Sequence, residues 1–277
     1  MKRIPKICHL TWTKDSPMSL LQVFTAITFH KHNPDWKIIV HLVMQTTDQL
    51  GANTYVPDYT GKDHFHMIAE MPYVEIHEVD LIEEGIEAQN KATMHISDIL
   101  RVKYLYEVGG VYSDFDMLWL RPMSEFGTIT RIGDPWDFET TACFYEGTFG
   151  HHNNSNIVSQ PKGKYLLSII EAQKELKPPY THQAFNSDIL NHLYPNYHII
   201  NDMFPRVLAI AYSTFYPYSI YNLSLLYEYC VPKIAYAKGV MGVHWFNGHE
   251  LSQDYVNKGD YRKGCSMSLI LKKEGLI

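Results

Sequence analysis

Residues 97–116 read SDILRVKYLYEVGGVYSDFD, and they predict a helix, a turn and a short strand in succession. The apolar residues of this stretch recur at helical spacing up to Tyr106, which predicts a helix that starts near the beginning of the stretch. Gly109 and Gly110 are the expected end of that helix, because glycine readily takes the left-handed conformation that closes helices. Residues 111–113 then predict a short strand, and an acidic pair follows it directly.

The segments before this stretch predict a parallel sheet. A buried strand at 4–12, a helix at 18–30 and a second strand at 36–43 follow one another along the chain. Parallel neighbours need a crossover connection, which a helix of this length supplies. A further short strand is expected at 74–79. We therefore expect an α/β protein with a mostly parallel central sheet.

The second half of the sequence is less regular. A helix is expected at 164–177, where two prolines end it. Weaker patterns predict helices at 82–92, 188–193 and 205–212, and edge strands at 199–201 and 234–236. The sequence contains no internal repeat, low-complexity tract or long linker, so we expect a single domain over residues 1–277.

Asp114 and Asp116 follow the predicted strand and are separated by one residue. Alternate residues of an extended chain point to the same side, so both carboxylates are expected to face one way. Such oxygens suit a hard divalent cation, and water or phosphate can complete its coordination. Apolar neighbours such as Phe115 and Trp119 would make an acidic pair costly without a cation. Ligands of parallel α/β sheets also bind at the carboxyl ends of strands.

Asp98 and Arg101 stand three residues apart on the predicted helix, so they share one of its faces. One interpretation is a surface ion pair of little energetic value. The other places both side chains at the corner between helix and strand, where they can bind sugar hydroxyls and phosphate. The spacing alone leaves both interpretations open.

The composition argues against several classes of protein. The net charge is −6 and no run of Lys and Arg exceeds two residues, which does not suit a nucleic-acid-binding groove. The four cysteines are far apart and form no zinc-binding pattern. No apolar run approaches the roughly 20 residues that span a bilayer. With no signal-peptide pattern at the N-terminus, we expect a cytoplasmic protein that can work at the periphery of a membrane.

Three blocks of the sequence resemble the glycosyltransferases with a DXD sugar-binding region. The nearest group is the glycosyltransferase family 32 type, with initiating mannosyltransferase-like proteins and capsular polysaccharide enzymes. Residues 95–116 are similar to the central signature of this family. Residues 4–12, IPKICHLTW, resemble its first strand, and residues 242–245, GVHW, resemble its C-terminal block. Residues 125–240 carry only faint similarity, and this is the region that normally shapes the acceptor site.

This resemblance implies a GT-A fold in which residues 1–125 bind the nucleotide sugar and the metal. Residues 126–277 would bind the acceptor and complete the site. The implied activity is a metal-dependent, retaining transfer from a nucleoside diphosphate sugar to a glycan hydroxyl, with UDP favoured over GDP. A retaining transfer at one face of the sugar needs no second pair of carboxylates, because the leaving phosphate can take the proton of the acceptor.

The resemblance also assigns roles to single residues. Asp114 and Asp116 would bind Mn²⁺ or Mg²⁺ bridging the diphosphate, with Asp116 the more direct ligand. Asp98 and Arg101 would hold the donor sugar and the diphosphate, and together with Asp116 they are the expected catalytic residues. His244 is a candidate third ligand, since imidazole suits Mn²⁺ at a mixed nitrogen and oxygen site.

Aromatic residues near these blocks complete the expected substrate-binding set. Trp12 would stack beside the nucleotide base or anchor the first strand. Tyr112 is placed with the substrate-binding residues, and Trp245 either closes over the diphosphate or fills the core beneath it. His9 is expected to pack structurally. The pairs His64/His66 and His151/His152 lack acidic or cysteine partners at ligand spacing, which favours surface histidines over a metal site.

Two alternatives to a transferase remain. A nucleotide-sugar or carbohydrate-binding module without turnover would share the fold and the cation but form no product. A phosphohydrolase with Asp114 as nucleophile is disfavoured, because such enzymes usually carry the nucleophile after the first strand. Here that strand ends in Thr11-Trp12-Thr13, which contains no Asp.

Overall fold

A computed structural model describes residues 4–51, 59–126, 138–144, 152–153, 155–259, 261 and 264–277. The strands are β1 (Ile7–Thr13), β2 (Lys37–Val43), β3 (Val74–Val79), β4 (Gly110–Ser113), β5 (Met117–Trp119), β6 (Thr140–Phe144), β7 (His152–Asn153), β8 (Asn156–Ser159), β9 (Val207–Ala211) and β10 (Gly242–His244). The helices are α1 (Leu20–His32), α2 (Phe65–Ala69), α3 (Thr93–Glu107), α5 (Lys164–Glu175), α6 (Ile189–Leu193), α7 (Tyr197–Met203), α8 (Ser224–Tyr227), α9 (Glu250–Lys258) and α10 (Ser266–Lys273). None of the helices in these ranges has the length and apolarity to cross a membrane.

The main sheet of the described residues has eight strands. Its order is β3-β2-β1-β4-β8-β6-β7, and β9 pairs with β6. The first four strands of this order run parallel, while β8 lies antiparallel to both β4 and β6. Strands β5 and β10 form a separate antiparallel pair. The expected α/β class with a mostly parallel central sheet is confirmed.

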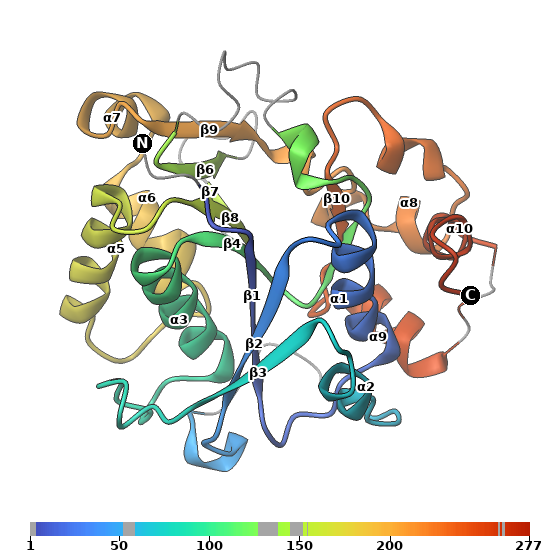
Figure 1. Cartoon of the computed structure of the whole chain (residues 1–277), viewed down its shortest axis with the longest axis horizontal. Coiled ribbons are helices and arrows are strands. Elements are labelled where there is room, and N and C mark those ends of the chain that lie inside the picture. Colours follow the sequence, from blue (N-terminus) through green and yellow to red (C-terminus); the bar gives the residue numbers. More distant parts are fainter. Residues whose placement is uncertain are drawn as a thin grey trace.

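Helices cover both faces of this sheet (Figure 1). Helices α3 and α5 lie on one side of β1, and α1 lies on the other. Helix α1 begins at a capping box, because the Ser19 hydroxyl accepts from the backbone N–H of Gln22 while the Gln22 side chain accepts from the Ser19 N–H. Residues on several of its faces are buried, and the β5 strand packs against it.

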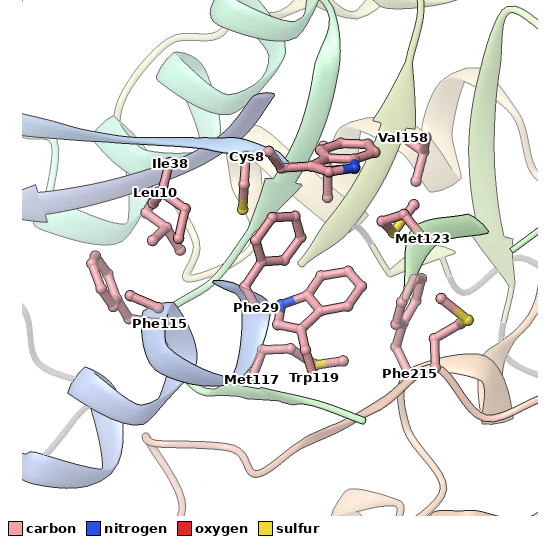
Figure 2. Close-up of a cluster of buried hydrophobic side chains, with 14 of the residues drawn as sticks. Cys8, Leu10, Phe29, Ile38, Phe115, Met117, Trp119, Met123, Val158 and Phe215 are labelled. Atoms are coloured by element: carbon pink, nitrogen blue, oxygen red, sulfur yellow. The ribbon is translucent and has the colours of Figure 1, made fainter. Parts of the chain in front are cut away.

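A cluster of aromatic rings packs between residues of β1 and β5 (Figure 2). Phe29 of α1 meets Trp119 of β5 edge-on at 5.1 Å between ring centroids, and Trp119 meets Phe215 in the same way at 5.7 Å. All three side chains are fully buried, against Cys8 and Leu10 of β1. Truncating one such ring to alanine typically costs about 3–5 kcal/mol, so this cluster fixes the layer that carries the acidic pair.

The turn between α3 and β4 depends on its two glycines. Gly109 and Gly110 have φ angles of 77° and 115°, which other residues rarely adopt. A Cβ atom on Gly110 would lie only 2.4 Å from the carbonyl oxygen of Ile7. The predicted end of the helix is therefore confirmed, and the close approach explains how β4 reaches its place beside β1.

Four expected segments differ in the structure. Residues 82–92 contain turns instead of a helix, and Asn90 has a positive φ of 63°. Residues 205–212 contain the strand β9, because the apolar run pairs in parallel with β6. The expected strand at 199–201 lies inside helix α7, whose N-terminus Asn196 caps. The expected strand at 234–236 is a 3₁₀ turn that starts at Pro232.

Candidate active site

The acidic pair occupies the connection between β4 and β5. Asp114 follows the last residue of β4, and Asp116 precedes the first residue of β5. Strand β5 pairs antiparallel with β10 so that Met117 lies opposite His244. This register brings a histidine from the C-terminal part of the chain next to Asp116.

Two threonines of α1 hold the backbone of this connection. The Thr25 hydroxyl donates to the carbonyl oxygen of Phe115 at 2.7 Å, between the two aspartates. The Thr28 hydroxyl accepts from the backbone N–H of Trp119 at 3.1 Å. On the other side, the N–H of Asp114 donates to the carbonyl of Ser155 at 3.0 Å. The direction of both carboxylates is therefore set by buried hydrogen bonds instead of by a free loop.

Asp114 is paired with Arg101 of α3. The guanidinium Nη2 atom lies 2.9 Å from Asp114 Oδ1 and 3.1 Å from Asp98 Oδ1. The side chains of Arg101 and Asp98 are only 5% and 7% exposed, which rules out the surface ion pair. The ring of Tyr112 lies beneath the guanidinium, with its centroid 4.6 Å from the central carbon. Asp98, Arg101 and Asp114 thus form one buried, charged group.

Burial dominates the electrostatics of this group. It raises the pKa of Asp98 to about 7, although Arg101 acts in the opposite direction. It likewise raises the pKa of Asp114 to about 6, with Arg101 lowering it and the charge of Asp116 adding to the rise. Asn186 donates from Nδ2 to Asp98 Oδ1 at 3.1 Å and so stabilises the ionised carboxylate. One arginine therefore faces two carboxylates that are costly to ionise.

Asp116 has a different environment. His244 Nε2 lies 3.0 Å from Asp116 Oδ1, and the backbone N–H of Asn247 donates to Oδ2 at 2.8 Å. Burial alone would raise the pKa of Asp116, but the neighbouring His244 and this N–H outweigh it and lower the pKa. The intervening Phe246 has a positive φ of 55°, a strained conformation for a bulky residue that turns the chain back toward the carboxylate.

The residues present fit a divalent cation. One ligand atom each from Asp114, Asp116 and His244 lie within 4.8 Å of one another. Asp116 Oδ1 is buried, and its partner is His244 Nε2 at 3.0 Å. His244 Nδ1 accepts from the N–H of Phe246 at 3.3 Å, so a neutral imidazole carries its proton on Nε2, facing Asp116. Two carboxylates and an imidazole are a donor set that Mn²⁺ and Mg²⁺ accept.

A cavity of 660 Å³ opens over this cluster at the carboxyl ends of β1 and β4. Six of the residues expected in the site line it, namely Trp12, Asp98, Arg101, Asp114, Asp116 and His244. Trp12 is half-buried, its indole N–H donates to the carbonyl of Ser16, and its ring meets Phe115 edge-on. This volume is in the range of sites that hold drug-sized ligands.

Two expected substrate-binding residues do not line the cavity. Trp245 is fully buried in the cluster beneath β10, so its side chain fills the core. Its backbone N–H still donates to the carbonyl of Asp116 at 2.8 Å. Tyr112 is buried as well, and its hydroxyl is bonded to Ser97 at 2.7 Å. Both residues are therefore part of the buried packing next to the site, not of the cavity lining.

The histidines outside the motifs are distributed unevenly. His152 is only 3% exposed and lines the cavity, so its expected surface position is wrong. Its Nε2 atom is bonded to the carbonyl of Tyr194 at 2.7 Å.

His151 lies outside the described residues. His66 is exposed and His64 is half-buried, as expected for residues near the surface. His9 is buried and bonded to His41 and to the carbonyl of Gly109, which matches its expected structural role.

Several other residues of the cavity have no signal in the sequence. Asn186 lies in the π-helical segment Ala184–Asp188, Tyr221 in the 3₁₀ turn Ile220–Asn222 and Asn247 in a turn, and none of them belongs to a recognisable motif. Their positions follow from tertiary structure, so no spacing rule indicates them. The acidic pair predicts that hydrogen-bond donors face its remaining oxygens. It does not indicate which residues of the sequence supply these donors.

The chain is similar to glycosyltransferases in sequence and in fold. Residues 1–141 match the family model described as a glycosyltransferase sugar-binding region containing a DXD motif. The apo-form glycosyltransferase GlyE of Streptococcus pneumoniae TIGR4 aligns with 100% of this chain at 9% identity and a TM-score of 0.51. This chain spans 64% of the GlyE chain, which is less than two thirds.

Two further solved structures are similar at lower scores. The galactosyltransferase LgtC, in complex with donor and acceptor sugar analogues, matches at 13% identity over 87% of each chain, with a TM-score of 0.45. The PaToxG glycosyltransferase matches at 14% identity over 74% of this chain and 71% of its own, with a TM-score of 0.48. A search among curated proteins finds no match. The mixed α/β fold is thus that of GT-A glycosyltransferases.

Proposed function

Because this chain belongs to the glycosyltransferase family whose sugar-binding region contains a DXD motif, we propose that it uses a divalent cation to bind a nucleoside diphosphate sugar. The donor is a UDP-sugar in preference to a GDP-sugar, and the acceptor is a hydroxyl group of a glycan. Residues 1–125 bind the donor and the cation, and residues 126–277 complete the site within one domain.

The observation that carries this proposal is the cluster of Asp114, Asp116 and His244, whose ligand atoms lie within 4.8 Å of one another at the cavity. Asp116 Oδ1 is buried, and His244 Nε2 lies 3.0 Å from it. A buried carboxylate oxygen in that position is costly unless a cation or a protonated group compensates it.

Asp114 and Asp116 would hold Mn²⁺ or Mg²⁺, and His244 would join them through Nε2 in the neutral tautomer that carries its proton on Nδ1, in place of the contact between Nδ1 and the N–H of Phe246. When bound, such an ion neutralises the charge that develops on the departing nucleoside diphosphate. Asp98 and Arg101 would bind the donor, with Arg101 oriented by its two carboxylate partners. Trp12 would contribute a flat indole face at the cavity wall for the nucleotide base.

We propose a retaining transfer at a single face of the sugar. The acceptor hydroxyl oxygen bonds to the anomeric carbon, the bond from that carbon to the phosphate oxygen breaks, and the hydroxyl proton passes to that phosphate oxygen. Among the described residues that line the cavity, the only carboxylates are Asp98, Asp114 and Asp116, each already paired. This supports a route without a protein nucleophile, and trapping of a sugar bound covalently to the chain would contradict it.

A donor panel tests the activity. Release of nucleoside diphosphate is measured from UDP- and GDP-sugars with Mn²⁺, with Mg²⁺ and with chelator. We expect cation-dependent release from one donor and loss of that release in Asp116→Asn. Cation-dependent binding without release from any donor would instead indicate a binding module without turnover.

A further inference from the structure

The cavity has two walls of different chemical character. The wall beside the acidic cluster carries all the Asp, Lys and Arg residues that line the cavity in the described part of the chain. The other wall consists of the lining residues between 152 and 249 other than His244, and its described members include no Asp, Glu, Lys or Arg. This second wall includes Asn153, His182, Gln183, Ser187, Tyr212 and Tyr221.

The second wall ends in an exposed apolar lip. Ile220 and Tyr221 line the cavity, yet they are 43% and 85% exposed. They lie on the 3₁₀ turn Ile220–Asn222, which Ser219 caps through a hydrogen bond from its N–H to Asn222 Oδ1 at 2.7 Å. Large apolar side chains exposed at the edge of a ligand cavity are typical of binding surfaces.

The lip is attached to a rigid part of the molecule. Tyr218, just before the turn, is fully buried, and its hydroxyl donates to the carbonyl of Val231 at 3.0 Å. Leu223, just after the turn, is also buried. Buried anchors on both sides fix the position of the exposed pair. Binding of a ligand to this pair therefore costs the protein little conformational entropy.

The charge of the cavity limits what can bind against the second wall. Its described lining has three carboxylates and one arginine, and Arg101 is already paired with Asp98 and Asp114. The described part of the second wall offers no lysine or arginine to an anion. An anionic acceptor would therefore find no lysine or arginine partner among the described residues of the second wall, and it would lie close to a donor that is itself anionic.

We infer that the second wall is an acceptor subsite for an uncharged saccharide, with Tyr221 as the surface on which a sugar ring stacks. The inference rests on the proposed function and adds the class of acceptor. A tyrosine ring offers a flat apolar face to the C–H face of a sugar, and its hydroxyl can bond to a sugar hydroxyl. The amides and hydroxyls of the wall would bind the remaining hydroxyl groups.

The test compares acceptor kinetics of Tyr221→Ala with those of Tyr229→Ala. Tyr229 is 58% exposed and does not line the cavity, so its variant is a matched control. Loss of one ring contact predicts a KM for a neutral disaccharide raised about tenfold in Tyr221→Ala, with the KM for the donor changed less. Tyr221→Phe, which keeps the ring, should restore most of the acceptor affinity, and Tyr229→Ala should match the unmodified chain.

A second arm compares neutral disaccharides with the same disaccharides bearing a sulfate group. We expect transfer to neutral acceptors only. Equal use of the sulfated acceptors, or an unchanged acceptor KM in Tyr221→Ala, would overturn the inference while leaving the proposed transferase intact. Donor hydrolysis without acceptor separates the two ideas, because absence of cation-dependent hydrolysis and of transfer in the unmodified chain would contradict both.

Discussion

Asp114 and Asp116 are two residues apart in one connection, yet their side-chain partners come from different parts of the chain. Asp114 is bound by Arg101 of α3, within the N-terminal part of the sheet. Asp116 is bound by His244 and the N–H of Asn247, which come from the C-terminal part of the chain. Burial raises the pKa of Asp114 to about 6, whereas His244 and Asn247 lower the pKa of Asp116.

This difference separates two tasks within one short motif. The partner of Asp114 is a permanent cation, so Asp114 is part of the framework that orients Arg101. The partner of Asp116 is a histidine that is itself a candidate metal ligand, so Asp116 and its partner can bind a metal ion together. Asp116 is therefore expected to matter most for activity, and the Arg101 group for stability.

The largest expected effect is on turnover in Asp116→Asn. Asparagine keeps an oxygen for the N–H of Asn247 but removes the charge that would hold the cation. Cation stabilisation of the leaving group contributes several kcal/mol, so transfer should fall about a thousandfold. Initial rates at saturating donor and Mn²⁺ measure this. A loss of less than about tenfold would show that Asp116 is not the principal ligand.

A large effect on stability is expected in Arg101→Met. The substitution leaves the buried carboxylates of Asp98 and Asp114 without their cation. Breaking such a pair typically costs about 3–5 kcal/mol of unfolding free energy. Urea unfolding at pH 7.5 measures the loss. Lys258→Met, in the exposed pair with Asp254, is the control and should cost at most about 1 kcal/mol. Equal losses in both variants would contradict the framework role of Arg101.

The raised pKa of Asp114 predicts how cation affinity depends on pH. A carboxylate must be ionised to bind a cation, and Asp114 ionises at a pKa of about 6 in the folded chain. Affinity for Mn²⁺ should therefore rise about tenfold per pH unit below 6 and level off above it. Titration calorimetry from pH 5 to pH 8 measures this profile. In Asp114→Asn the rise in Mn²⁺ affinity with pH should be lost. A flat profile in the unmodified chain would contradict the difference in pKa between Asp114 and Asp116.

A smaller effect is expected in Thr25→Val, which keeps the shape of the side chain. It removes the hydroxyl that donates to the carbonyl of Phe115 between the two aspartates. An unsatisfied buried carbonyl costs about 1 kcal/mol or more, so Mn²⁺ affinity should fall about fivefold as the motif relaxes. Thr25→Ser keeps the hydroxyl and should bind Mn²⁺ normally. Equal affinity in both variants would show that α1 does not position the motif.

The N-terminal half of the fold could be predicted because its signals are local. Apolar runs marked β1, β2 and β3, and the glycines at 109 and 110 marked the end of α3. In the C-terminal half, five apolar residues at 207–211 were compatible with helix or strand, and pairing with β6 decided between them. Such pairing partners lie far away in the sequence, and short segments carry too little periodicity to reveal them.

The site shows the same limit at the level of single residues. The spacing of Asp114 and Asp116 indicated a cation site, and the structure brings His244 beside them. Asn186 and Asn247 were missed because one reaches the aspartates from a kinked π-helical segment and the other from a turn, and neither has a sequence signature. The positive φ of Phe246, which aims the N–H of Asn247 at Asp116, has no signature in the sequence.

The most direct test of a cation held by Asp116 is a titration of UDP into the chain. Binding is measured calorimetrically with Mn²⁺ and with chelator, in the unmodified chain and in Asp116→Asn. We expect the unmodified chain to bind UDP only with Mn²⁺, and Asp116→Asn to show no Mn²⁺-dependent binding. Equal UDP binding with chelator, or an unchanged Mn²⁺ dependence in Asp116→Asn, would contradict the assignment of this pair as the cation site.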